Sequence, residues 1–131
     1  TLQTSSAQAV SADGLIIATP TGSTAYALAV GGPILPPEMR NTLIVPIAPH
    51  RSLEHAIVLP EGTAVNITVR TSHQAVVSVD GQDPHSVENE DAVNIETSKN
   101  TARFIRLHEP GFFYRNLINS LVRNSYPESV S

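Results

Sequence analysis

The chain has 131 residues, 40% of them hydrophobic, and 8 basic against 12 acidic side chains give a formal net charge of −4. This length supports one hydrophobic core, so we expect a single domain over residues 1–131. Lys99 is the only lysine and cysteine is absent, which argues against a nucleic-acid surface and excludes disulfides, thiolate nucleophiles and zinc–sulfur sites.

The sequence also argues against a membrane protein. No apolar stretch approaches the roughly 20 residues that span a bilayer, and the N-terminal residues do not follow the secretory-signal pattern. We therefore expect a cytoplasmic protein. Residues 1–12 are polar and weakly patterned, and Asp13-Gly14 then leads directly into an apolar run. This favours a piece of a longer protein over a disordered leader.

A polar bend separates the first two predicted elements. Residues 15–18 predict a strand and residues at about 23–30 predict a helix, with the string TPTGSTAY at 19–26 joining them. The first N–H groups of a helix lack intrahelical partners at the positive end of the macrodipole, so such a turn suits anionic or polar ligand atoms. The same residues also suit an ordinary helix N-cap, and spacing alone does not decide between the two interpretations.

Further apolar runs along the chain predict strands. Turn-forming residues such as Asp80-Gly81 separate them at spacings of about a dozen residues, which favours an antiparallel arrangement. The 10 prolines also argue against an all-helical fold. The expected strands cover residues 43–48, 56–59, 64–70, 75–79, 92–95 and 102–107.

The pattern changes after Pro110-Gly111. Apolar residues recur at helical spacing between 112 and 122, which predicts an amphipathic C-terminal helix that covers the sheet or docks on a neighbouring domain. Together the elements predict a mainly β fold. We expect a two-layer, antiparallel β-sandwich-like domain with one helix after the TPTGSTAY turn and a C-terminal helix.

Two common phosphate-binding motifs do not fit the sequence. Gly31-Gly32 ends the predicted helix and is followed by Pro33, whereas the dinucleotide fingerprint needs glycines that open a helix. Gly22 is not followed by lysine, so the Walker pattern does not fit either.

The histidines give little support for a triad or a metal site. A Ser23–His50–Asp80 triad can be written down, as it can for most chains with five histidines and many serines. His50, Glu54 and His55 lie between strand-like runs and do not match the helical zinc motif. We interpret these histidines as residues of turns, together with His73, His85 and His108.

Two aspartates precede glycine at the ends of predicted strands. Asp80-Gly81 is typical of a tight hairpin turn, although Asp80 and Gln82 could also project from the sheet end toward a ligand. Asp13-Gly14 carries the same two interpretations. A carboxylate at this place could accept hydrogen bonds from ribose hydroxyls or an amide.

Several strings in this chain closely resemble the signature of NAD kinases. The run ADGLIIATPTGSTAY at 12–26 and GGPI at 31–34 carry most of the resemblance, and TPTGSTAY is highly specific. Supporting matches are PIAPH at 46–50, IVLP at 57–60 and VDGQ at 79–82. The resemblance extends from about residue 12 to 122.

The resemblance implies transfer of the terminal phosphoryl group of ATP, or of polyphosphate in some members, to the adenosine-side 2′-hydroxyl of NAD. The family uses ATP with a divalent metal, Mg²⁺, and combines an N-terminal α/β domain with a C-terminal β-rich domain. This chain resembles the second domain only. The family's Gly-Gly-Asp-Gly motif, whose aspartate is the general base, does not occur here. The resemblance also places the Asn-Glu pair that meets the NAD outside this chain. We therefore expect no catalytic residue in this chain and no activity when it is isolated.

The resemblance also assigns residues to the dinucleotide site. Asp13 matches an aspartate that contacts the ribose or nicotinamide side of NAD, and Gln82 matches a ligand-contact position in the sheet-end loop. The matched substrate-binding positions are Asp13, Thr24, Ala25, Tyr26, Ala29 and Gln82.

This chain departs from the family pattern at a few positions. Ala27 and Ala29 stand where serines are frequent, so hydrogen bonds from those hydroxyls would be lost. Ser11 stands where some relatives carry a basic residue. These departures leave the preference between NAD and NADH open.

Family members assemble as dimers or tetramers through this β domain, so the resemblance implies a homo-oligomer and an N-terminal α/β partner domain. One alternative is a non-catalytic nucleotide-binding or regulatory β domain. Another is the partner domain of a lipid-kinase-like protein, but the acidic balance argues against binding to anionic membranes.

Overall fold

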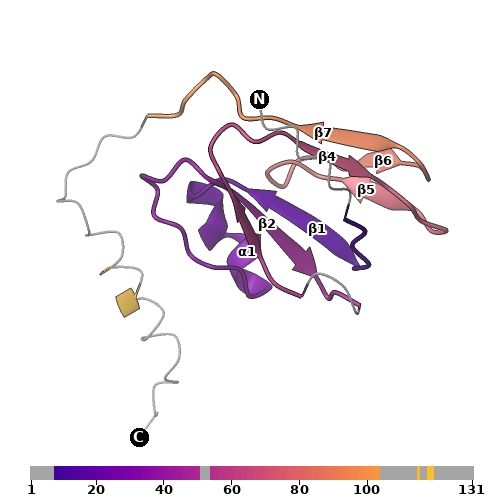
Figure 1. Ribbon diagram of the computed structural model, residues 1–131, viewed down its shortest axis with the longest axis horizontal. Coiled ribbons are helices and arrows are strands. Elements are labelled where there is room, and N and C mark those ends of the chain that lie inside the picture. The colour runs from indigo at the N-terminus through magenta and orange to yellow at the C-terminus, as the bar shows by residue number, and fades with distance from the viewer. Residues whose placement is uncertain (1–7, 51–53, 104–114, 116–117, 120–131) are drawn as a thin grey trace, which may run out of the picture.

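The computed structural model describes residues 8–50, 54–103, 115 and 118–119, and most of its regular elements are β-strands (Figure 1). Residues 115, 118 and 119 are helical. The elements in chain order are β1 (Gly14–Ala18), the 3₁₀ helix η1 (Thr21–Thr24), α1 (Tyr26–Ala29), β2 (Thr42–Ile47), β3 (Ile57–Leu59), β4 (Val65–Thr68), β5 (Ala75–Val77), β6 (His85–Val87) and β7 (Ala92–Ile95).

The strands form antiparallel sheets. One sheet has three strands in the order β1-β2-β3, and two further pairs join β4 to β7 and β5 to β6. The prediction of a mainly β, antiparallel domain with few helices is therefore confirmed. Within the described ranges, no helix is long and apolar enough to cross a membrane.

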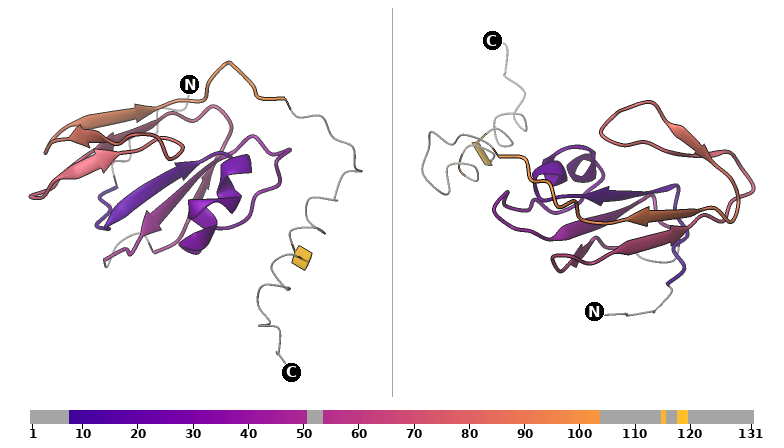
Figure 2. Two further views of the ribbon diagram at one scale, coloured as in Figure 1. Left: turned by 180° about the vertical axis from the view of Figure 1, so that it is seen from behind. Right: turned by 90° about the horizontal axis from the view of Figure 1, so that it is seen from above.

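The helical segment lies beside the three-stranded sheet (Figure 2). Buried residues of α1 and β2, together with Leu35, form the hydrophobic core. Ala27 of α1 and Leu43 of β2 are fully buried, and Val45 and Leu35 are nearly so. Leu43 and Val45 are two residues apart, so they lie on the same face of β2. The sheet thus gives α1 and the bend before it a fixed support.

Pro46 lies within β2 and has no backbone N–H. In a strand that pairs on both sides, this would remove a hydrogen bond of the sheet. The pairing explains why it is tolerated. β3 pairs with β2 only from Thr42 to Ile44, whereas Pro46 stands opposite Leu15 in the pair with β1. Proline therefore falls where β2 has one strand neighbour.

Residue alternation explains the second pair of strands. Val65 and Ile67 of β4 are partly buried, whereas Asn66 and Thr68 are exposed. This period of two is typical of a strand with one solvated face. The strand predicted at 64–70 is therefore confirmed as β4, which is shorter than expected.

The structure differs from the sequence-based expectation in several elements. The helix expected over 23–30 is two short helical turns, because Ala25 has φ −91° and ψ −126° and interrupts the helix. β6 was not predicted, and His85 lies on this strand rather than in a turn. Of the run expected at 102–107, residues 102 and 103 are not in a strand. The remaining positions of that run lie outside the described residues, as do most of those expected in the C-terminal helix at 112–122.

Candidate functional site

The bend after β1 is closed by its own hydrogen bonds. The hydroxyl of Thr19 accepts the N–H of Gly22 over 3.1 Å. The N–H of Ser23 donates to the carbonyl of Pro20 over 3.1 Å, and the N–H of Ala25 donates to Gly22 over 3.2 Å. These N–H groups already have partners, so a ligand at this bend would meet side chains and other exposed atoms instead.

Ser23 holds the bend against the segment that follows the helix. Its side chain is fully buried, and its hydroxyl donates to the carbonyl of Pro20 over 2.6 Å. The same oxygen accepts the N–H of Leu35 over 3.0 Å. A buried hydroxyl that both donates and accepts fixes both backbone segments.

Gly31-Gly32 ends the helix, as predicted. Gly31 has φ +91°, the left-handed conformation typical of a residue just past a helix end. Gly32 is buried, and its N–H donates to the carbonyl of Ala27 over 2.8 Å. A Cβ at Gly32 would lie 2.7 Å from that oxygen and 2.9 Å from Cγ2 of Val45. Only glycine lets the chain pass this close to α1.

The predicted site residues of the helical segment form an exposed surface. Tyr26 is 59% exposed, and Ala25 and Ala29 are also exposed. Tyr26 and Ala29 are three positions apart and therefore lie on one side of α1. Thr24 is half-buried, and its hydroxyl donates to the carbonyl of Thr21 over 3.3 Å.

Ala27 has a different place. It is fully buried and belongs to the hydrophobic core under α1. The resemblance expects serine at both Ala27 and Ala29. Of these two positions, Ala29 is exposed and accessible to a ligand.

Asp13 stands at the far end of β1 from this surface. The five residues of β1 separate it from the bend, a strand length of about 17 Å at 3.3 Å per residue. The N–H of Asp13 donates to the carbonyl of Ile47 over 2.9 Å. Its side-chain Oδ1 lies 3.0 Å from Nε2 of His50.

The sequence reasoning missed this pairing of Asp13 with His50. The two residues are 37 positions apart, and His50 was interpreted as a turn residue. A signal was available: in an antiparallel pair, the residue that precedes the first strand meets the residues that follow the second. Applying that rule to the strands around residues 15–18 and 43–48 would have placed the two side chains together.

Gln82 lies in the turn between β5 and β6. Asp80 has φ +49° and Gly81 has φ +69°, the conformation of a type I′ hairpin turn. The N–H of Gln82 donates to the carbonyl of Val79 over 2.9 Å. The hairpin interpretation of Asp80-Gly81 is therefore confirmed, and the side chain of Gln82 is exposed.

The structure thus brings together Thr24 of η1, Tyr26 and Ala29 of α1, and Ala25 at the junction of the two helical turns. It places Asp13 at the start of β1 and Gln82 in the β5–β6 turn. Asp13 and Gln82 therefore lie at strand ends away from the helical turns.

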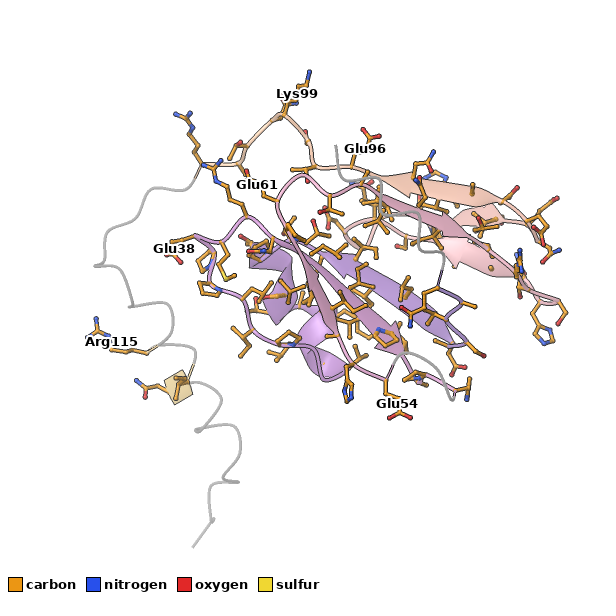
Figure 3. The ribbon with its side chains drawn as sticks, viewed as in Figure 1. Glu38, Glu54, Glu61, Glu96, Lys99 and Arg115 are labelled. Carbon is orange, nitrogen blue, oxygen red and sulfur yellow. The ribbon has the colours of Figure 1, made fainter. Side chains whose placement is uncertain are left out.

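The alternative triad is not assembled. The Ser23 hydroxyl is buried on Pro20 and Leu35, His50 faces Asp13, and Asp80 lies in the hairpin turn. Glu54 and His55 lie in a non-helical connection before β3. Glu54, Glu96 and Lys99 point outward from the body of the molecule (Figure 3). In the part of the chain that the structure describes, no three His, Asp or Glu side chains gather as metal ligands.

Comparisons with known proteins place this arrangement in a family. The sequence model of the family "ATP-NAD kinase C-terminal domain" matches residues 1–107 of this chain. A NAD kinase from Heliobacterium modesticaldum is 47% identical over 104 residues, which cover 79% of this chain and 37% of that protein. A NAD kinase from Dehalococcoides mccartyi is 39% identical over 119 residues, which cover 91% of this chain and 41% of that protein.

Solved structures agree with the sequence matches. Yeast NADH kinase complexed with NADH has a TM-score of 0.74 and 32% identity over 93% of this chain and 36% of that one. A NAD kinase from Archaeoglobus fulgidus in complex with ATP has a TM-score of 0.69 and 31% identity over 86% of this chain and 42% of that one. The chain therefore spans less than half the length of these relatives. These matches favour the NAD kinase interpretation over the lipid-kinase-like one, and the chain belongs to the ATP-NAD kinase C-terminal domain family.

Proposed function

We propose that this chain is the dinucleotide-binding domain of a NAD kinase. The whole enzyme would transfer the terminal phosphoryl group of ATP, or of polyphosphate, to the adenosine-side 2′-hydroxyl of NAD and release NADP. The observation that carries the proposal is a surface of this family's chain that we call the η1–α1 surface; it is formed by half-buried Thr24 and exposed Ala25, Tyr26 and Ala29. Two of the similar structures are described with NADH and with ATP bound.

The exposed side chains suit a dinucleotide. Tyr26 offers an aromatic face to a base and a hydroxyl to a polar partner. The Thr24 oxygen keeps acceptor capacity while its proton engages Thr21. Asp13 can accept hydrogen bonds from ribose hydroxyls or the nicotinamide amide, and Gln82 can donate and accept through its amide.

These residues position a substrate and do not activate it. Phosphoryl transfer needs a base for the attacking hydroxyl and groups that hold the phosphates and their metal. The described residues offer no cluster of metal ligands. In this proposal the N-terminal α/β domain supplies the base and holds Mg²⁺ with the phosphates, while this domain orients NAD.

We extend the proposal to assembly and location. The family resemblance implies a homo-oligomer formed through this β domain. We also propose a cytoplasmic location for the whole enzyme, with which the absence of cysteine from this chain is compatible.

The test is an assay of the full-length protein that contains this chain. Incubation with NAD, ATP and magnesium should yield NADP, and a parallel reaction with polyphosphate identifies the donor. Failure to form NADP with either donor, by a protein that is folded and binds ATP, would overturn the proposal.

A further inference from the structure

His50 has no assigned role, yet its backbone is joined to the segment that carries Asp13. The N–H of His50 donates to the carbonyl of Ser11 over 2.7 Å, and the N–H of Asp13 donates to Ile47 over 2.9 Å. These bonds continue the β1–β2 pairing past its last partners, Gly14 and Ile47. The main chain therefore holds the two residues beside each other before their side chains are considered.

The segment that leads to His50 follows an unusual backbone path. Ala48 has φ +46°, the left-handed region that few alanines adopt. Such a conformation persists only where the surrounding structure holds it in place. Here it redirects the chain after β2, and His50 reaches Ser11 two residues later.

The side chains meet in solvent. Nε2 of His50 lies 3.0 Å from Oδ1 of Asp13, with the side chains 64% and 67% exposed. An ionised carboxylate can only accept, so Nε2 is the donor in this contact. The contact engages one carboxylate oxygen, Oδ1, and solvent exposure leaves the carboxylate accessible to a ligand.

An ion pair this exposed contributes little to folding stability. It can nevertheless restrict the carboxylate, because a free aspartate side chain samples several rotamers. We propose that His50 is a positioning residue, which holds the Asp13 carboxylate in one orientation for the dinucleotide. This inference rests on the proposed function, in which Asp13 contacts NAD.

The experiment uses the full-length protein and compares H50A, H50Q, D13A and the double variant H50A/D13A. A glutamine can donate an N–H at a reach similar to that of histidine Nε2. H50Q should therefore keep KM for NAD close to that of the parent protein. The matched control is H55A, which removes another exposed histidine nearby. The readouts are KM for NAD, KM for ATP, kcat and the melting temperature.

We expect H50A to raise KM for NAD about three- to tenfold, the effect of losing one orienting hydrogen bond. KM for ATP, kcat and the melting temperature should stay unchanged, and H55A should behave like the parent. H50A/D13A should be no worse than D13A, because His50 acts through the Asp13 carboxylate.

Two contrary results distinguish an error in the role of His50 from an error in the proposed function. If D13A, which removes the acceptor oxygens, leaves KM for NAD unchanged, the assignment of Asp13 to the dinucleotide site is wrong. If D13A raises KM for NAD and H50A does not, only the role of His50 is wrong. Full additivity in the double variant, or a lower melting temperature in H50A that H50Q does not restore, would also contradict a positioning role.

Discussion

The buried Ser23 hydroxyl accepts the backbone N–H of Leu35 over 3.0 Å, across 12 positions of sequence. With its donation to Pro20, this contact joins the bend after β1 to the chain that leaves α1. The exposed residues between Ser23 and Leu35, including Tyr26, therefore belong to a segment whose two ends are hydrogen-bonded together. A surface on a rigid support loses less conformational entropy when it binds a ligand.

Removing the Ser23 hydroxyl should weaken the fold. S23A leaves the buried Leu35 N–H without its acceptor, which costs about 1–3 kcal/mol of the free energy of unfolding. Urea denaturation of the purified chain measures this loss, and one cooperative transition is expected if residues 1–131 form a single domain. The control S78A removes an exposed hydroxyl that donates to Gln82 and should change stability by about 0.5 kcal/mol or less. Equal effects of the two variants would contradict the account.

Gly32 should be the least replaceable glycine near the helix. In G32A, the new Cβ meets the carbonyl of Ala27 at 2.7 Å, so α1 or β2 must shift, at about 1–3 kcal/mol. The control G22A places its Cβ at 3.4 Å from Oγ1 of Thr19, an ordinary contact, and should be tolerated. Thermal denaturation compares them, and a G32A variant as stable as G22A would be inconsistent with this packing.

The β5–β6 turn should depend on Gly81. Its φ of +69° is costly for a residue with a Cβ, so G81A should lose about 1–2 kcal/mol. D83A changes an exposed neighbour in the same connection and is the matched control. Hydrogen exchange at β5 and β6 should accelerate in G81A only. Unchanged exchange would show that the turn does not need a left-handed glycine.

The isolated chain should be catalytically inactive. Residues 1–131 contain no Gly-Gly-Asp-Gly base motif, so NAD, ATP and magnesium should yield no NADP above background. The full-length protein, prepared in the same way, is the positive control. NADP formation by the purified chain would show that its own residues suffice for phosphoryl transfer.

Much of the fold could be predicted where local chemistry is decisive. Asp80-Gly81 predicted a hairpin because these residues tolerate positive φ, and Gly31-Gly32 predicted a helix end for the same reason. The alternation through 64–70 predicted a half-buried strand, which is β4. Each of these signals lies within a few residues of the structure it specifies.

The remainder depends on distant contacts or on very short elements. The break at Ala25 carries no local signal, because alanine favours a helix and yet has φ −91° and ψ −126° here. β6 has three residues, His85–Val87, too few for a periodic pattern. The contact of Asp13 with His50 follows from strand pairing between β1 and β2, which no local motif encodes.

The central claim is that the η1–α1 surface receives NAD while other parts of the kinase handle ATP. It is tested most directly by measuring KM for both substrates in T24A and Y26F variants of the full-length protein. We predict that each variant raises KM for NAD by up to about tenfold, the value of one lost hydrogen bond, and leaves KM for ATP unchanged. Equal increases for the two substrates, or no change for NAD, would contradict the claim.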